Sequence, residues 1–216
     1  MKLLFFGDSI TDMNRERETN ERVHSYGDGF VFLVASNLQF KFPRKYEIVN
    51  RGISGNGIFD LYARIKGNVW KENPDVLTIL IGINDIMRDL DDDKDCYRWG
   101  KIYRMMIEDT QKRLLNTKII LCEPFALKGS ATDCLAKVGF FEKVNEYRAE
   151  VKRIAIEYGL SLVELQERFE ELAIKYGEEE VLFDGIHPDT VGAMLIANEW
   201  LKTFDKMNGN KDVEFI

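Results

Sequence analysis

The sequence predicts a single α/β domain in which helices cover both faces of a parallel β-sheet. Short apolar runs alternate with longer amphipathic segments, and no linker or shift in composition interrupts them. This alternation is typical of parallel strands joined by helical crossovers. With 216 residues, of which 45% are apolar, the chain is long enough to bury one sizeable core. We therefore expect one domain at residues 1–207, followed by a frayed tail at residues 208–216.

Five short apolar runs are interpreted as the strands of this sheet. The run from Val76 to Ile81 is nearly continuous in apolar residues, as expected for a strand that is buried on both faces. The first run, from Leu3 to Phe6, stops abruptly at Gly7-Asp8-Ser9. In chain order, the predicted strands occupy residues 3–6, 46–49, 76–81, 119–122 and 160–163.

The helices are predicted from apolar side chains that recur at helical spacing. Gly159 and Gly177 follow two of these segments at the position where glycine often ends a helix. Pro188 stands at the start of the last segment, where its missing N–H costs little. The segment from Met13 to His24 is polar and has no periodicity, so we interpret it as an exposed loop. In chain order, the predicted helices occupy residues 30–38, 58–65, 99–114, 144–158, 165–176 and 189–204.

Composition and charge argue against several classes of protein. A net charge of −7 does not suit a nucleic-acid-binding surface, and no apolar run approaches the ~18 residues that span a membrane. Lys2 precedes only four apolar residues before Gly7, which is not the pattern of a signal peptide. Three cysteines are too few for a disulfide framework. We therefore expect a cytoplasmic protein that binds neither nucleic acid nor a membrane.

The sequence also argues against a metal centre and an organic cofactor. Only two histidines are present, His24 and His187, which does not suit a histidine-rich metal site. The acidic segment from Asp91 to Asp95 lacks the glycine and the glutamate of a calcium-binding loop. The glycines of the 52–57 segment run opposite to the dinucleotide-binding fingerprint. We expect no metal and no cofactor.

Three chemically distinctive segments follow predicted strands. They are Ser9, the glycine-containing loop at residues 52–57 and Asn84. The carboxyl ends of parallel strands lie at one edge of the sheet, where such sheets place their ligands. A fourth segment, Asp184-x-x-His187, precedes the last predicted helix. These residues are far apart in sequence, but the predicted sheet can bring them together.

The residue types suit acyl transfer. A serine is a weak nucleophile until an adjacent base takes its proton, and His187 can be that base because an imidazole accepts protons near neutral pH. We prefer His187 to His24 because only His187 has an acid three residues away, Asp184, which can orient the imidazole. The developing oxyanion needs preorganised donors. The Ser9 and Gly55 N–H groups and the Asn84 amide can supply them.

Each of these features also has an ordinary structural explanation. The glycines can allow a turn with positive φ, and Asn84-Asp85 can form a local turn. Asp184 can be a turn residue, and His187 can bond to a backbone carbonyl. Taken singly, these explanations are preferable, but their occurrence at the ends of successive strands favours a shared site.

Four segments resemble the motif blocks of the SGNH (GDSL-type) hydrolase family, in the family's order. Gly7-Asp8-Ser9 is similar to the first block, with Ile10 in place of its leucine. The other three resembling segments are Asn50–Gly55, Gly82–Asp85 and Asp184–Pro188. The resemblance implies a flavodoxin-like three-layer α/β/α sandwich with a five-stranded parallel sheet. It also implies a catalytic triad of Ser9, Asp184 and His187, with Ser9, Gly55 and Asn84 forming the oxyanion hole.

Within the family, residues 4–12, 50–55 and 79–85 most resemble the intracellular carbohydrate acetylesterases, the acetylxylan esterase branch. The resemblance implies a serine esterase that hydrolyses acetyl esters of small carbohydrates, such as acetylated xylooligosaccharides, through an acyl-enzyme. Its expected partner is a small-molecule ester, and the chain can form a homo-oligomer. One alternative is a lysophospholipase or acyl thioesterase of the same family. Another is a flavodoxin-like module that binds FMN or a sugar without turnover.

Overall fold

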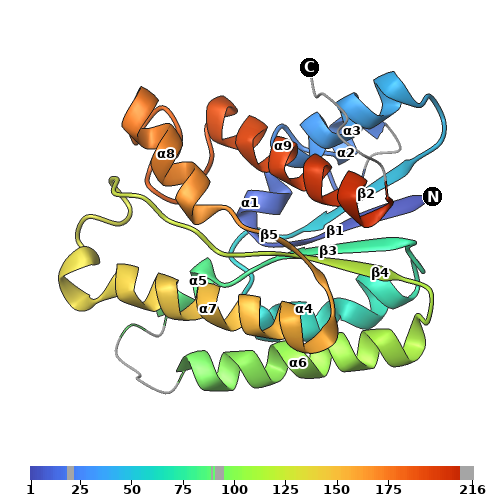
Figure 1. Cartoon of the computed structure of the whole chain (residues 1–216), viewed down its shortest axis with the longest axis horizontal. Helices are drawn as coiled ribbons and strands as arrows, with labels where there is room; N and C mark the ends of the chain where they lie inside the picture. Colours follow the sequence, from blue (N-terminus) through green and yellow to red (C-terminus); the bar gives the residue numbers. More distant parts are fainter. Residues whose placement is uncertain (19–21, 89, 91–94, 210–216) are drawn as a thin grey trace.

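The computed structural model describes residues 1–18, 22–88, 90 and 95–209 and has three layers (Figure 1). A five-stranded parallel sheet forms the middle layer, in the strand order β2-β1-β3-β4-β5. This is the flavodoxin-like order, so the predicted fold class is confirmed. The strands are β1 (Lys2–Gly7), β2 (Glu47–Gly52), β3 (Val76–Leu80), β4 (Lys118–Cys122) and β5 (Ser161–Val163).

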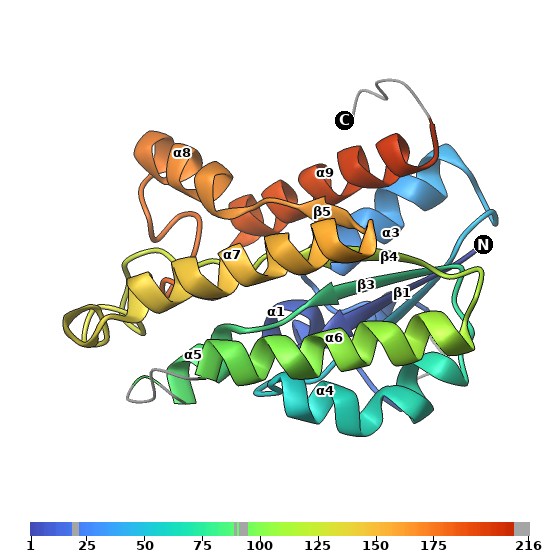
Figure 2. The same cartoon turned by 60° about the horizontal axis from the view of Figure 1, so that its bottom comes forward.

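Helices cover both faces of the sheet. Helices α3, α8 and α9 lie on one side, and α4, α6 and α7 lie side by side on the other (Figures 1 and 2). The longer helices are α3 (Phe30–Lys41), α4 (Ile58–Ile65), α6 (Asp95–Arg113), α7 (Phe140–Tyr158), α8 (Gln166–Tyr176) and α9 (Thr190–Met207). The short ones are α1 (Ser9–Asp12), α2 (Arg22–Ser25) and α5 (Ile83–Arg88), with a π-helical turn at Lys66–Trp70 and a 3₁₀ turn at Ala136–Val138.

Aromatic packing joins the central strands to the α3–α9 layer. The ring of Phe5 on β1 lies 5.7 Å from Phe30 of α3 and 5.1 Å from Trp200 of α9, measured between ring centroids. The Trp200 indole N–H donates to the Thr78 hydroxyl on β3 at 2.9 Å, so this buried donor is satisfied. Phe5 and Thr78 are register partners on adjacent strands. These contacts hold β1 and β3 rigidly beneath the loops that follow them.

All five predicted strands and all six predicted helices are present, with shifted boundaries. Three short helices were not predicted: α1, α2 and α5. The exposed loop predicted at residues 13–24 is wrong in two respects. Part of it forms α2, and the Arg15 side chain is only 7% exposed because its guanidinium donates to the Gly52 carbonyl. Of the predicted frayed tail, Asn208 and Gly209 form a turn, and residues 210–216 lie outside the described residues.

Within the described ranges, no helix combines the length and the apolar character that crossing a bilayer requires.

Candidate active site

The strand order brings the three predicted strand-end segments together. Strand β1, which leads into Ser9, lies between β2 and β3 in the sheet. The loop after β2 contains Gly55, and the loop after β3 leads into α5 with Asn84 at its second residue. The order of the chain reverses between β1 and β3, and parallel α/β sheets form their ligand-binding crevice at this point. Ser9 therefore lies between the two segments that contain the expected oxyanion donors.

A tight turn places Ser9 at the start of α1. A Cβ at Gly7 would lie 2.4 Å from the Leu80 carbonyl oxygen of β3, so only glycine fits where β1 ends. Asp8 caps α1, and its Oδ1 accepts the Ile10 N–H at 3.0 Å. Because Ser9 is the first residue of α1, its N–H has no acceptor within the helix. This N–H remains available to an oxyanion.

Ser9, His187 and Asp184 form a continuous hydrogen-bonded chain. Ser9 Oγ lies 2.9 Å from His187 Nε2, and His187 Nδ1 lies 2.7 Å from Asp184 Oδ2. The other oxygen of Asp184, Oδ1, accepts the backbone N–H groups of Ile186 at 2.9 Å and His187 at 2.7 Å. Burial would raise the pKa of Asp184, but these bonds to His187 and Ile186 lower it below its ordinary value. Asp184 therefore stays ionised and orients the imidazole toward Ser9.

A segment of residues 127–132 supports the Asp184–His187 loop from behind. The Leu127 N–H donates to the Gly185 carbonyl and the Ala131 N–H donates to the Asp184 carbonyl, both at 2.9 Å. A Cβ at Gly129 would lie 2.4 Å from the Gly185 nitrogen, so the two backbones approach as closely as glycine permits. Sequence analysis missed Gly129, because a single glycine in an irregular segment is not a recognisable signal.

The expected oxyanion donors lie on either side of Ser9. Gly55 has a φ of 81°, and a Cβ there would meet no atom within 4 Å, so it borders open space. The Asn84 amide donates to the Asn56 carbonyl at 3.1 Å and lies 3.5 Å from Asp8 Oδ2. Asn84 thus contacts the neighbour of Gly55 and the neighbour of Ser9. The structure brings all five predicted site residues together; their catalytic roles remain predictions.

Arg64 joins the ends of β1 and β2 to the Gly55 loop. Its guanidinium donates to the Gly7 carbonyl at 3.0 Å, the Arg51 carbonyl at 2.8 Å and Asn56 Oδ1 at 2.7 Å. Burial, reinforced by the nearby Arg15, lowers the pKa of Arg64 to about 10, which leaves it charged at neutral pH. Arg64 lies in the last turn of α4, and nothing in the local sequence pattern distinguishes it from a surface arginine.

Asp8 is an unusual acid directly beside the predicted nucleophile. Its side chain is buried, and this burial together with the nearby Asp85 carboxylate raises its pKa to about 7. The hydrogen bond from the Ile10 N–H opposes the increase without cancelling it. In the unfolded chain, Asp8 loses its proton near the ordinary aspartate pKa of 3.8. In the folded protein, it keeps this proton until the pH approaches about 7.

This difference predicts how Asp8 contributes to stability as the pH changes. A raised carboxyl pKa stabilises the folded state at low pH, and this contribution disappears as the pH rises through about 7. We expect Asp8→Asn to reduce the fall in unfolding free energy between pH 5 and pH 8, by at most about 3 kcal/mol, since the pKa of Asp8 lies about two pH units above the lower limit. Urea unfolding at both pH values measures the effect. The exposed Asp133→Asn removes an equal charge and should leave the pH dependence as in the wild type; an identical slope in both variants would contradict the prediction.

The other features considered from the sequence lie outside this site. His24 pairs with Glu16 at 3.2 Å, and its side chain is 51% exposed, as expected of a surface histidine. Among the described residues, no three His, Cys, Asp or Glu side chains are grouped so that they can hold a metal ion. The segment weighed as a calcium loop lies almost entirely outside the described residues.

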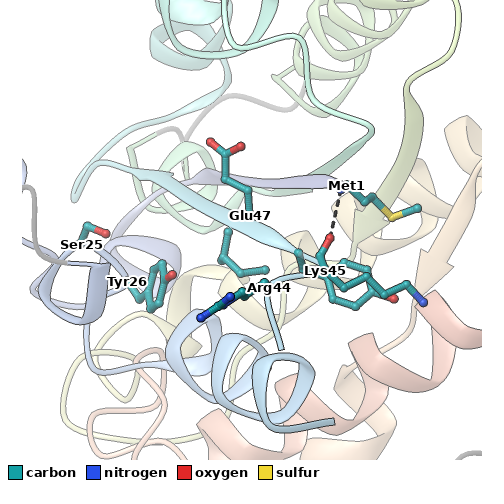
Figure 3. Close-up of a pocket in the computed structure, with 8 residues that line it drawn as sticks. Met1, Ser25, Tyr26, Arg44, Lys45 and Glu47 are labelled. Carbon is teal, nitrogen blue, oxygen red and sulfur yellow. Dashed lines mark hydrogen bonds between the residues drawn. The ribbon is translucent and has the colours of Figure 1, made fainter. Parts of the chain in front are cut away.

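A pocket of about 610 Å³ lies at the amino end of β2 (Figure 3). Its lining includes Arg44, Lys45 and Glu47, and the Met1 amino group donates to the Lys45 carbonyl at 3.1 Å. Gly52, next to the predicted site, is at the opposite end of β2, roughly 16 Å away along the strand. This pocket is therefore separate from the Ser9 site.

Comparison with known proteins decides the family. Residues 5–195 match the protein family described as "GDSL-like Lipase/Acylhydrolase family". The chain belongs to this family. The resemblance deduced from the four motif segments is thereby confirmed, and the chain is a carboxylic ester hydrolase. Membership in an acylhydrolase family argues against the alternative of a binding module without turnover.

Several known proteins are similar to this one over nearly the whole chain. An acetylxylan esterase from Geobacillus stearothermophilus is 35% identical over 209 residues, which cover 93% of this chain and 92% of that protein. The crystal structure of a GDSL-like lipase from Parabacteroides merdae has a TM-score of 0.88 at 33% identity and covers 94% of both chains. A catalytic mutant of an acetylxylan esterase from G. stearothermophilus has a TM-score of 0.83 at 31% identity, covering 100% of this chain and 97% of that chain.

Proposed function

We propose that this protein is a serine esterase that removes acetyl groups from small carbohydrate esters, such as acetylated xylooligosaccharides. The observation that carries the proposal is the hydrogen-bonded chain from Ser9 through His187 to Asp184, flanked by Gly55 and Asn84. The acetyl and carbohydrate parts rest on the 35% identity to an acetylxylan esterase over 93% of the chain.

In the proposed reaction, Ser9 Oγ attacks the ester carbonyl carbon while His187 Nε2 takes its proton. The carbonyl electron pair moves to the oxygen, which accepts hydrogen bonds from the Ser9 N–H, the Gly55 N–H and the Asn84 amide. The intermediate collapses, the C–O bond to the alcohol breaks, and His187 returns the proton to the leaving oxygen. A water molecule then attacks acetyl-Ser9 while His187 Nε2 takes its proton. The C–O bond to Ser9 breaks, His187 returns the proton to Ser9 Oγ, and acetic acid leaves. Asp184 holds the imidazole in one tautomer throughout.

The solved relatives support these roles. Three structures of the acetylxylan esterase from G. stearothermophilus are described as catalytic mutants, in which a serine, an aspartate or a histidine is replaced by alanine. The replaced aspartate and histidine of that enzyme are three positions apart. Asp184 and His187 have the same spacing in this chain.

A series of p-nitrophenyl esters tests the acyl-chain part of the proposal. Each methylene that an enzyme buries in an apolar groove contributes about 0.8 kcal/mol, so an enzyme for long acyl chains shows kcat/KM that rises with chain length. We expect the opposite here: the acetyl ester should have the highest kcat/KM, and the butyryl and octanoyl esters successively lower values. A preference for octanoate would instead support the lysophospholipase or thioesterase alternative.

Release of acetate from acetylated xylooligosaccharides tests the alcohol part. A lysophospholipid and an acyl thioester, assayed in parallel, represent the alternative substrates. The proposal requires acetate release from the oligosaccharide with a higher kcat/KM than the turnover of either alternative. Four other expectations remain predictions. The chain is expected to need no metal or organic cofactor and to bind neither nucleic acid nor a membrane. It is also expected to reside in the cytoplasm and to be able to form a homo-oligomer.

A further inference from the structure

Asp12 connects the helix that begins with Ser9 to the loop that contains Gly55. It is the last residue of α1, three positions after Ser9, and its side chain is 5% exposed. A buried carboxylate requires compensating partners. The mechanism proposed above uses none of its atoms, so its partners must explain why a charge is buried so close to the nucleophile.

The partners of Asp12 lie on the Gly55 loop and on two arginines. Asp12 Oδ2 accepts the Ser54 N–H at 3.0 Å and the Ser54 hydroxyl at 3.3 Å. The same oxygen pairs with Arg17 at 2.9 Å, and Oδ1 lies 3.8 Å from Arg15 Nε. The two arginines offset the cost of burying the carboxyl group, and a carboxylate oxygen makes a stronger hydrogen bond to a backbone N–H than a neutral acceptor does.

The Ser54 N–H and the Gly55 N–H belong to consecutive peptide groups, so holding the first restricts where the second can lie. Gly55 has positive φ, has no side chain, and a Cβ there would have no atom within 4 Å. Packing around its Cα therefore does not set the direction of its N–H. On the far side of Gly55, Arg88 donates to the Gly55 carbonyl and Asn84 donates to the Asn56 carbonyl. The loop is thus held on both sides of Gly55, and Asp12 provides the contact on the side of Ser9.

Helix α1 itself is fixed against β2. A Cβ at Gly52 would lie 2.2 Å from the Asp12 nitrogen, so the helix and the strand end are in closest contact. Arg15 donates to the Gly52 carbonyl at 2.9 Å, and the Asn50 amide donates to the Thr11 carbonyl at 2.6 Å. Because these contacts hold α1 against β2, the hydrogen bond that the Ser54 N–H donates to Asp12 sets the position of the Gly55 loop relative to Ser9.

We propose that Asp12 is a positioning residue, which by holding the Ser54 N–H places the Gly55 N–H where the oxyanion on the Ser9 adduct forms. The inference rests on the proposed function, in which Ser9 is the nucleophile and Gly55 is a donor. An oxyanion donor acts at 2.7–3.1 Å from the developing charge, and a displacement of about 1 Å can cost 10²-fold in rate. Asp12 therefore affects the transition state more than the binding of the ester.

Asp12→Ala tests the proposal with p-nitrophenyl acetate as substrate. We expect kcat to fall by about 10- to 100-fold with KM within about threefold of the wild type, since the ground-state carbonyl uses the donor weakly. Asn84→Ala sets the scale for complete loss of one donor, about 10²–10³-fold in kcat. Rates are expressed per active site, counted by the burst of p-nitrophenol from a p-nitrophenyl phosphonate, so that misfolded protein does not contribute.

Two further variants keep the test decisive if Asp12→Ala folds poorly. Asp12→Asn preserves the size and an oxygen that can accept the Ser54 N–H, so it should recover most of the lost kcat. Ser54→Ala removes the hydroxyl contact but keeps the N–H, and its kcat should stay within about twofold of the wild type. Loss of kcat in Ser54→Ala equal to that in Asp12→Ala would overturn the proposal, because the hydroxyl would then be the important partner.

Inhibition by a small alkylboronic acid separates positioning from a general structural role. The boronate forms a tetrahedral adduct with a serine oxygen and resembles the transition state. We expect its Ki in Asp12→Ala to rise by the same factor by which kcat/KM falls. An unchanged Ki, or an activity loss that disappears when rates are corrected for titrated sites, would overturn the proposal. Failure of the proposed function is a different result, in which Ser9→Ala keeps its activity and the phosphonate produces no burst.

Discussion

Ser9→Ala is expected to lower kcat for p-nitrophenyl acetate by about 10⁶-fold, the scale found when a triad serine is removed from a serine hydrolase. The variant has no oxygen within reach of His187 Nε2, which lies 2.9 Å from Ser9 Oγ in the wild type. No acyl-enzyme can form. The remaining donors can still polarise the carbonyl for attack by water, so a small rate above the uncatalysed reaction should persist.

The measurement is p-nitrophenol release by purified wild type and variant at matched concentrations. Ser54→Ala is the matched control, because it removes a hydroxyl from the same site but keeps the nucleophile. The unfolding temperatures of both variants should lie within a few degrees of the wild type, since Ser9 is only partly buried and Ser54 is exposed. Equal rates in wild type and Ser9→Ala would show that Ser9 is not the nucleophile and would refute the proposed mechanism.

Asp184→Asn is expected to lower kcat by about 10⁴-fold while preserving the fold. Asp184 Oδ1 accepts two backbone N–H groups, from Ile186 and His187, so the amide oxygen of the asparagine must occupy that position. The amide nitrogen then faces His187 Nδ1, which is forced to accept a hydrogen bond. In that tautomer Nε2 carries the proton and cannot take another from Ser9.

The same assay measures this loss, with thermal unfolding as a check on the fold. Asp189→Asn is the matched control: Asp189 caps α9 five residues along the chain, and asparagine caps helices equally well. Its kcat should equal that of the wild type. If Asp184→Asn retained more than a tenth of the wild-type kcat, the tautomer of His187 would not depend on Asp184, and the triad would need another orienting group.

Local chemistry explains why the principal site residues were predictable. Ser9, Gly55 and Asn84 each follow an apolar strand, and in a parallel sheet strand ends converge at one edge. Asp184 and His187 are three residues apart, so a single turn can join them. The helices and strands were predictable for a similar reason, because hydrophobic periodicity is a property of neighbouring residues. The short helices α1 and α5 were missed because four to six residues are too few to show that periodicity.

The residues that support the site could not be found in this way. Asp12 and Ser54 are 42 positions apart, and Arg64 is 57 positions from the Gly7 carbonyl that it binds. Gly129 matters only because the Asp184–Gly185 backbone passes within contact distance of it. These roles depend on which segments the folded chain places side by side, and no local pattern records that.

The sequence by itself therefore determined the α/β class, the family and the five residues of the proposed catalytic chemistry, because motif and periodicity are local. The tertiary structure alone decided the strand order, which puts Ser9 between Gly55 and Asn84. It also decided the raised pKa of Asp8 and the hydrogen bond from Ser54 to Asp12. Burial and proximity set the energies of charged groups and donors, and both exist only once segments distant in sequence have packed together.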